Sequence, residues 1–187
     1  VAYQTAWLKV HHTAEFMSAN LTSEMRIIDR VVILINECKK MKIEVVPPNI
    51  NISYEDFRPV DKTTISYGLN AIKNVGSKAL ETIIFERKEN GPYESIFDLC
   101  ARVDQQKVNK RVLESLVMAG AMDSIEGNRF QKFSAVDDAI KYGQQMQNES
   151  NRNQVDMFGS AGLEEDLIKI PTLKELPEWS EKDALSK

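Results

Sequence analysis

The sequence predicts a mainly α-helical protein with one small β element. Apolar residues at helical spacing recur through most of residues 2–142, and β-branched residues, prolines and turn residues interrupt them between 43 and 67. Apolar residues fill 42% of the 187 positions and charged residues 28%, which is the range of globular proteins. A polar stretch at 143–153 and an acidic end predict a flexible C-terminal tail.

The first 67 residues predict two helices and the β element. Apolar residues three and four apart indicate helices over 2–20 and 24–41, the second well buried along a stripe that includes Ile28, Val32 and Ile35. Residues 43–46 are mostly β-branched and precede two prolines, which predicts a short strand. Residues 52–67 predict the remaining strands, with a turn at 61–64.

From residue 69 onward the pattern predicts helices separated by short breaks. The helices are expected near 69–73, 76–89, 95–101, 108–119 and 128–142, and the breaks at Asn74, Asn90-Gly91-Pro92 and Gly120. Residues 143–153, GQQMQNESNRN, are nearly free of apolar groups and predict a flexible linker. Little stable structure is expected over 160–187, where single apolar residues stand among acids and prolines.

The distribution of charge limits how this chain could bind nucleic acid. The net charge is −4, with eleven basic and ten acidic side chains in residues 61–133 and six and eleven in residues 134–187. A large basic surface is therefore excluded. Any contact with DNA must be local and made largely by backbone amides.

The two cysteines and the apolar runs indicate an intracellular protein. Cys38 and Cys100 each lie among apolar residues, which is typical of buried free thiols. The sequence shows no signal peptide and no apolar run long enough to cross a membrane, so we expect a cytoplasmic location and no membrane partner. Because the chain begins at Val1 in helical rhythm and ends without a stop signal, we expect a piece of a longer protein.

A corner between two helices is the first candidate site. Residues 69–83, LNAIKNVGSKALETI, place an apolar residue between Asn74 and Gly76, two residue types that tolerate a positive φ. The unpaired amides at the start of the second helix would form an anion site that suits a phosphate. The candidate DNA-binding residues here are Lys73, Asn74, Val75, Gly76, Ser77 and Lys78. The pattern resembles the helix-hairpin-helix motif, with Asn74 in place of its first glycine; the alternative is an ordinary corner between helices.

A weaker second copy follows. An apolar helix stripe ending at Val117 precedes the small-residue turn Ala119-Gly120-Ala121, before a helix that begins near Asn128. Lys110, Arg111 and Gly120 are its candidate DNA-binding residues. Taken alone, such a cluster is more often a solvated helix face. Paired units pack into one DNA-binding domain, so each copy supports the other, and both would contact phosphates without reading sequence.

The second candidate site is a short peptide directly after the polar stretch. Residues 154–159, QVDMFG, expose a Met-Phe pair that nothing nearby in the sequence can bury. Met157 and Phe158 could fill an apolar pocket on a partner, with Gln154 hydrogen-bonding at its edge and Asp156 beside them. The peptide resembles the motif that binds the bacterial sliding clamp. Its alternative is that Phe158 folds back onto the helical domain.

Together these segments resemble the family C replicative DNA polymerases, the alpha subunits of bacterial DNA polymerase III. The opening AYQTAWLKVHHTAEFMSANLTSEM, the hairpin YGLNAIKNVGSKALETII and the peptide QVDMFG occur in family order across roughly residues 2–160. The resemblance implies the end of the fingers domain over 1–50 and a tandem helix-hairpin-helix domain over 51–145. A linker with the clamp-binding peptide over 146–160 and an acidic, poorly ordered tail over 161–187 would follow. The implied partners are duplex DNA, the sliding clamp and other replicase subunits.

No catalytic or metal site is expected in this chain. Nucleotidyl transfer needs carboxylates that hold two metal ions, and the resemblance places them in the palm domain, before residue 1. The whole polymerase would use magnesium, whereas this segment would carry no cofactor and no activity of its own. Asp137-Asp138 and Glu164-Glu165-Asp166 are the tight acidic clusters, and they suit helix-face or tail charges better.

Two further functions remain open from the sequence. One is a helix-hairpin-helix module of a repair nuclease or ligase, which would differ in the acidic residues that precede this segment. The other is a structural interaction domain that binds neither DNA nor clamp.

Overall fold

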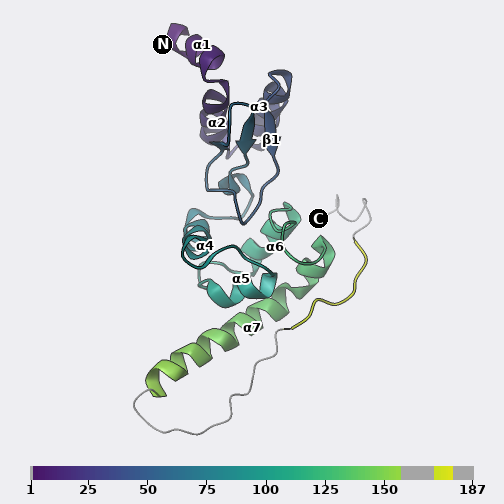
Figure 1. The fold of residues 1–187 in the computed structure, drawn as a ribbon. Helices are drawn as coiled ribbons and strands as arrows, with labels where there is room; N and C mark the ends of the chain where they lie inside the picture. The colour runs from purple at the N-terminus through teal and green to yellow at the C-terminus, as the bar shows by residue number, and fades with distance from the viewer. Residues whose placement is uncertain (1, 157–170, 179–187) are drawn as a thin grey trace.

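The computed structural model describes residues 2–156 and 171–178, with the backbone alone for residues 150–156. Its fold is mainly α-helical with one three-stranded sheet, as the sequence predicts. Figure 1 shows helix α1 at one end of the molecule, the sheet beside α2 and α3, and α4 to α7 at the other end. The helices that carry the candidate corners therefore lie together, away from the N-terminus.

The N-terminal helix predicted over 2–20 is two helices in the structure. They are α1 (Ala2–His11) and α2 (Thr13–Glu24), separated at His12, where the backbone leaves the helical region with φ −135° and ψ 55°. Helix α3 (Ile28–Lys40) follows after a short turn. The predicted β element is confirmed as β1 (Glu44–Val46), β2 (Arg58–Pro59) and β3 (Thr64–Ser66). The central strand β3 pairs parallel with β1 and antiparallel with β2.

The strands and the first helices share one apolar core. Buried residues of α2 and α3 pack with Phe57 and Ile65 from the β element, so these strands group with the N-terminal helices and not with the helical end. The predicted buried stripe of α3 is wrong in detail, because Ile28 and Val32 are 62% and 51% exposed whereas Val31 is buried. Helical spacing identifies an apolar face but does not tell whether a partner element covers it.

The other end of the molecule is a four-helix unit with its own core. The short 3-10 helix η1 (Leu69–Ala71) leads into α4 (Ser77–Asn90), α5 (Ile96–Arg102), α6 (Lys110–Met118) and α7 (Arg129–Asp156). Apolar residues of all four helices form one cluster, which includes Cys100.

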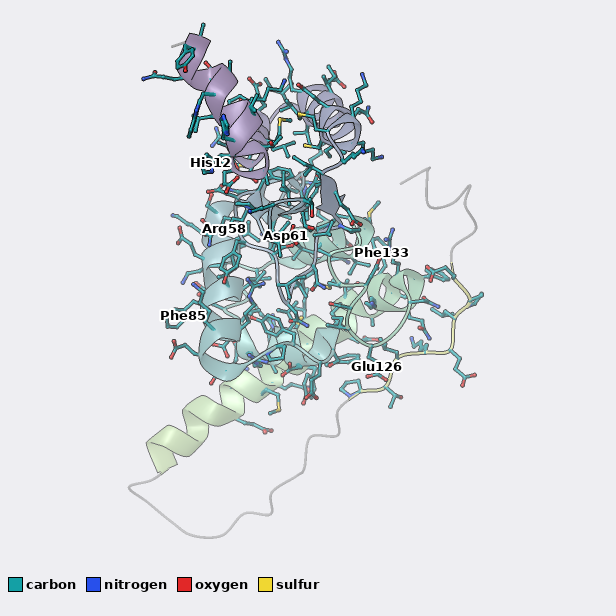
Figure 2. All side chains as sticks on the ribbon, turned by 45° about the horizontal axis from the view of Figure 1, so that its top comes forward. His12, Arg58, Asp61, Phe85, Glu126 and Phe133 are labelled. Carbon is teal, nitrogen blue, oxygen red and sulfur yellow. The ribbon has the colours of Figure 1, made fainter. Side chains whose placement is uncertain are left out.

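Both Cys38 and Cys100 are buried free thiols, as predicted. The outer face of α4 is open to solvent, and Phe85 on it is 65% exposed (Figure 2).

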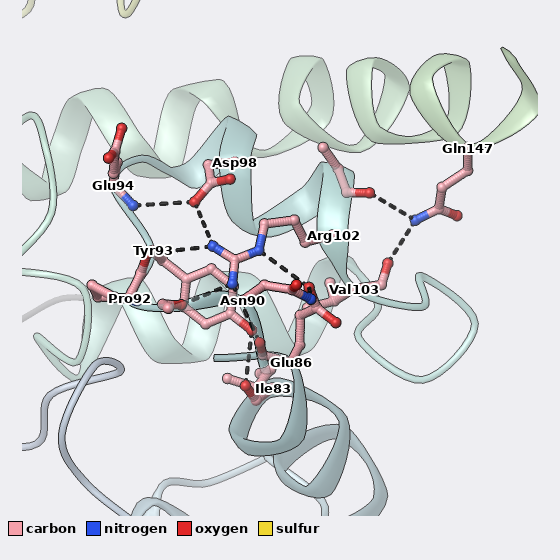
Figure 3. A network of polar contacts seen from close by, with 12 residues as sticks. Ile83, Glu86, Asn90, Pro92, Tyr93, Glu94, Asp98, Arg102, Val103 and Gln147 are labelled. Atoms are coloured by element: carbon pink, nitrogen blue, oxygen red, sulfur yellow. Dashed lines mark hydrogen bonds and ion pairs between the residues drawn. The ribbon is translucent and has the colours of Figure 1, made fainter. Parts of the chain in front are cut away.

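A polar network around Arg102 fixes the turn between α4 and α5 (Figure 3). The guanidinium contacts Glu86 at 3.2 Å and Asp98 at 3.0 Å, and it donates to the Gly91 carbonyl at 2.8 Å. It also lies 4.5 Å from the centre of the Tyr93 ring, whose hydroxyl donates to the Ile83 carbonyl. Acceptors from both helices and from the turn thus converge on one side chain, which holds α4 and α5 at a fixed angle.

The linker predicted over 143–153 is helical instead. Helix α7 continues through it to Asp156, and Tyr142 and Gly143 are buried against the rest of the unit. The prediction was wrong because a Gln-rich composition was interpreted as unstructured, although Gln is a good helix former. Helix α7 projects beyond the other helices (Figure 1).

Residues 171–178 have neither helix nor strand, yet they are docked on the start of α7. Asn128 Nδ2 donates to the Leu176 carbonyl at 2.8 Å, and Gln131 Nε2 donates to the Lys174 carbonyl at 3.0 Å. Leu173 packs against the apolar core of the helical unit. This part of the tail thus lacks regular secondary structure but contacts the helical unit.

Candidate nucleic-acid interface

The first predicted corner has the backbone geometry of a tight hairpin. Asn74 adopts a left-handed conformation with φ 66°, so it takes the place of a glycine as the sequence suggested. Val75 is 6% exposed and plugs the space between η1 and α4. Gly76 then ends the turn in an extended conformation and caps α4, which begins at Ser77.

The amides at this corner are free to bind an anion. Gly76, Ser77 and Lys78 are exposed, and among the residues that the structure describes no acceptor pairs with their N–H groups. The first satisfied amides are those of Ala79 and Leu80, which both donate to the Gly76 carbonyl. Free N–H groups and the positive end of the helix dipole coincide here. This is the arrangement that binds phosphate oxygens.

Gly76 leaves the space in front of these amides empty. A Cβ added there would meet no heavy atom within 4 Å, and its φ of −92° suits any residue. Neither strain nor protein packing therefore requires glycine at this position. The small residue does keep the approach to the three amides open.

A second corner is present, but it precedes α6 and does not follow it. Val108 is buried, as Val75 is, and the next residue, Asn109, caps α6 with its side chain accepting from the Val112 amide at 3.2 Å. Asn109, Lys110 and Arg111 are exposed, and within the described part of the chain their amides have no acceptor. The order of buried valine, capping residue and free amides thus repeats that of the first corner.

Gly120 was predicted to bind DNA in the turn of the second corner, but the structure does not support this role. It is buried, its φ is 79°, and its amide donates to the Val117 carbonyl at 3.0 Å. The side chains of Arg129 and Asp123 stand where a Cβ of Gly120 would lie. Gly120 turns the chain after α6, but its amide is already paired, so it cannot hold a phosphate.

The role of Asn109 as the cap of this helix was not predicted, because the helix was expected to begin at residue 108. A capping residue preceded by a valine and followed by two cations was the signal that could have found it. The first corner is also linked to α6, the helix that the second corner begins, since Asn74 Nδ2 lies 3.3 Å from Ser115 Oγ. One apolar core holds both valines. The two sets of free amides therefore belong to one rigid unit.

The candidate cations differ in how free their charges are. Lys73, Lys78 and Arg111 are exposed, and among the described residues none of them lies in an ion pair. Lys110, in contrast, contacts the Asp137 carboxylate at 2.8 Å. That hydrogen bond raises the pKa of Lys110. Its charge is thus partly compensated by α7, whereas the other three are available to an anion.

The candidate clamp-binding residues lie at or beyond the end of α7. Gln154 and Asp156 are in its last turn, and only their backbone is described. Met157 and Phe158 lie outside the described residues. The geometry of this peptide therefore adds nothing to the sequence prediction.

The described ranges 2–156 and 171–178 hold no group of three or more His, Cys, Asp or Glu side chains placed to bind a metal ion. Asp137 is paired with Lys110, and Glu164-Glu165-Asp166 lie outside the described residues. None of the described helices is both long and apolar enough to cross a membrane.

Comparison with known proteins gives a consistent picture. The helix-hairpin-helix motif family matches residues 42–132, which include both corners. The chain is 42% identical over 183 residues to the DNA polymerase III subunit alpha of Vibrio cholerae and to that of Pasteurella multocida, covering 97% of this chain. It is 41% identical over 169 residues to the subunit alpha of Escherichia coli K12. It spans only about 16% of the length of the Vibrio and Pasteurella relatives and 15% of the Escherichia one.

Proposed function

Because the chain belongs to the DNA polymerase III alpha subunit family, we propose that the protein it is part of is a DNA-directed DNA polymerase, and that this segment binds the backbone of duplex DNA. The observation that carries the proposal is the pair of corners, each with three exposed amides that have no acceptor within the described residues. The relatives from Vibrio cholerae, Pasteurella multocida and Escherichia coli are all DNA polymerase III alpha subunits. Nothing in them favours a repair nuclease or ligase.

The binding mechanism follows from what the corners offer. Each corner presents N–H donors at a helix start, where a phosphate oxygen gains directional hydrogen bonds and a favourable dipole. Lys73, Lys78 and Arg111 add charge beside the amides. Since these groups meet phosphates and not base edges, binding is independent of sequence and weakens steeply with salt.

We assign the nucleotidyl-transfer reaction to other parts of the polymerase. Nucleotidyl transfer of this class uses carboxylates that hold two metal ions, with magnesium as the usual metal. We place these carboxylates outside residues 1–187, so the segment positions duplex DNA and adds no nucleotides itself. Primer extension by the isolated 187-residue chain with magnesium and all four nucleotides would refute this.

Clamp binding is proposed for residues 154–158. The support is the sequence of the peptide and its place at the end of α7, which projects beyond the other helices of the unit (Figure 1). A weak peptide contact gains effective affinity when DNA is held by the same chain. Replacing Met157 and Phe158 with alanine should abolish capture by a sliding clamp loaded on DNA, and retained capture would contradict the assignment.

Association with other replicase subunits and a cytoplasmic location follow from the proposal that the whole protein is a polymerase subunit.

The duplex-binding proposal is tested by changing one corner. We expect Gly76→Asp combined with Lys78→Ala to weaken binding to a random-sequence duplex, measured by fluorescence anisotropy at two salt concentrations. The carboxylate would occupy the empty approach and repel a phosphate. The log–log salt slope should become shallower by roughly 0.9 for each phosphate that the variant no longer neutralises. Unchanged affinity at both salt concentrations would remove the first corner from the DNA interface.

A further inference from the structure

A concave pocket lies between the first corner and α6. Its volume is about 620 Å³, within the range of roughly 300–1,000 Å³ typical of small-ligand sites. Lys73 and Asn74 line it from the corner, and Arg111 and Ser115 line it from α6. The hydrogen bond between Asn74 and Ser115 links these two walls.

The polar groups of the pocket are suited to an anion. Within the part of the chain that the structure describes, its lining includes two cations and no acidic residue. Neither Lys73 nor Arg111 has an ion-pair partner among those residues. In a chain with 28 acidic and 24 basic side chains, two unpaired cations facing one pocket leave a local positive potential.

The remaining wall is largely apolar. Tyr67 and Met118 contribute to it, and the Tyr67 ring packs on Phe57 with 4.8 Å between ring centres. Burial raises the pKa of the Tyr67 phenol, so it stays neutral at physiological pH. Tyr67 contacts the apolar cores of both the N-terminal helices and the helical unit. The pocket thus lies at the junction of the two cores, a frequent position for ligand sites.

We propose that this pocket binds one nucleotide unit, with its phosphate at Lys73 and Arg111 and its sugar or base against Tyr67 and Met118. An anionic head joined to a flat, partly apolar body matches the two kinds of wall. The unit can come from a DNA strand that crosses between the corners or from a free nucleotide. The inference deepens the proposed function, on which it rests for the class of ligand.

The direct test is an NMR titration of the 15N-labelled 187-residue chain with deoxyadenosine 5′-monophosphate, with inorganic phosphate and with a short duplex. We expect the nucleotide to shift the amide signals of Asn74, Ser115 and Met118, more than phosphate does at the same concentration. Shifts by the duplex as well assign the site to a strand nucleotide, and shifts by the mononucleotide alone assign it to a free one. Equal shifts by phosphate and nucleotide, or none by nucleotide and duplex, overturn the proposal.

Charge-neutral variants test which cations bind. Lys73→Gln combined with Arg111→Gln should reduce mononucleotide affinity at least fivefold, and both residues are exposed, so the fold should persist. Lys40→Gln combined with Lys62→Gln removes the same charge from exposed positions elsewhere and should leave affinity unchanged. An equal loss in both variants would show a general charge effect and overturn the site. Amide shifts at Gly76 to Lys78 report separately on the corner, so failure of the pocket and failure of duplex binding are distinguishable.

Discussion

The side-chain amide of Gln147 donates a hydrogen bond to the carbonyl of Val103 at 2.7 Å (Figure 3). The same nitrogen lies 3.4 Å from the Ala101 carbonyl. Both carbonyls are at the C-terminal end of α5, where helical carbonyls have no partner in their own helix. A residue of the predicted linker thus satisfies groups more than forty positions earlier and ties the middle of α7 to the corner between α5 and α6.

Replacing Gln147 with alanine should therefore loosen this contact. We expect a loss of about 1 kcal/mol in the free energy of unfolding, because two part-buried carbonyls lose their donor while helix propensity improves slightly. Denaturant titration measures the loss. Gln145→Ala is the matched control, since Gln145 is exposed on the same helix. If both variants unfold at the same denaturant concentration, the contact contributes nothing.

Two glycines should lose stability to different extents when they are replaced by alanine. At Gly143 a Cβ would clash with the Cys100 carbonyl and the Gln105 side chain, and moving a backbone apart typically costs about 1–3 kcal/mol. At Gly76 the same Cβ meets open space, so Gly76→Ala should cost only about 0.5–1 kcal/mol, because alanine is a poorer helix cap than glycine. The Gly76 variant should nevertheless bind duplex DNA more weakly, because its methyl group narrows the approach to the amides. Thermal unfolding and anisotropy titration of the two variants separate these effects.

Local signals predicted much of the fold and the first corner. Asn74 and Gly76 flank an apolar residue, and that pattern alone indicates a left-handed turn before a helix. The short strands were also predictable, because prolines and β-branched residues bound them. These features depend on residues within a few positions of one another.

What escaped prediction depends on contacts between distant residues. The length of α7 was missed because Gln147 is stabilised by carbonyls of α5 and not by its neighbours. The second corner was placed at Gly120, since a glycine is a stronger turn signal than Asn109. The pocket could not be foreseen, because Tyr67 and Arg111 come together only through packing of the two cores.

The two thiols should resist modification in the folded protein. Burial raises the pKa of Cys100 to about 12, and burial together with the nearby Glu37 charge raises the pKa of Cys38 to about 11. The thiolate is the reactive form, so at pH 8 both should react with a disulfide reagent far more slowly than after unfolding. Because the folded pKa values lie above the unfolded value near 9, stability from these groups is full below pH 9 and lost as pH rises through 11 to 12. Rapid labelling of both thiols at pH 8 without denaturant would contradict this.

Removing the Asp137 carboxylate should strengthen DNA binding. Asp137 holds the Lys110 ammonium at 2.8 Å beside the free amides of the second corner, and Glu114 lies 3.9 Å from the same ammonium. Asp137→Asn therefore removes the nearer of its two carboxylate partners where a phosphate is proposed to bind. We expect a several-fold gain in duplex affinity at low salt and little gain at high salt, because exposed charges are screened. Asp138→Asn is the control, as it removes the same charge from the adjacent exposed position, and Asp138 lies in no ion pair within the described residues. Equal gains from both variants would mean that only net charge matters and that Lys110 does not contact DNA.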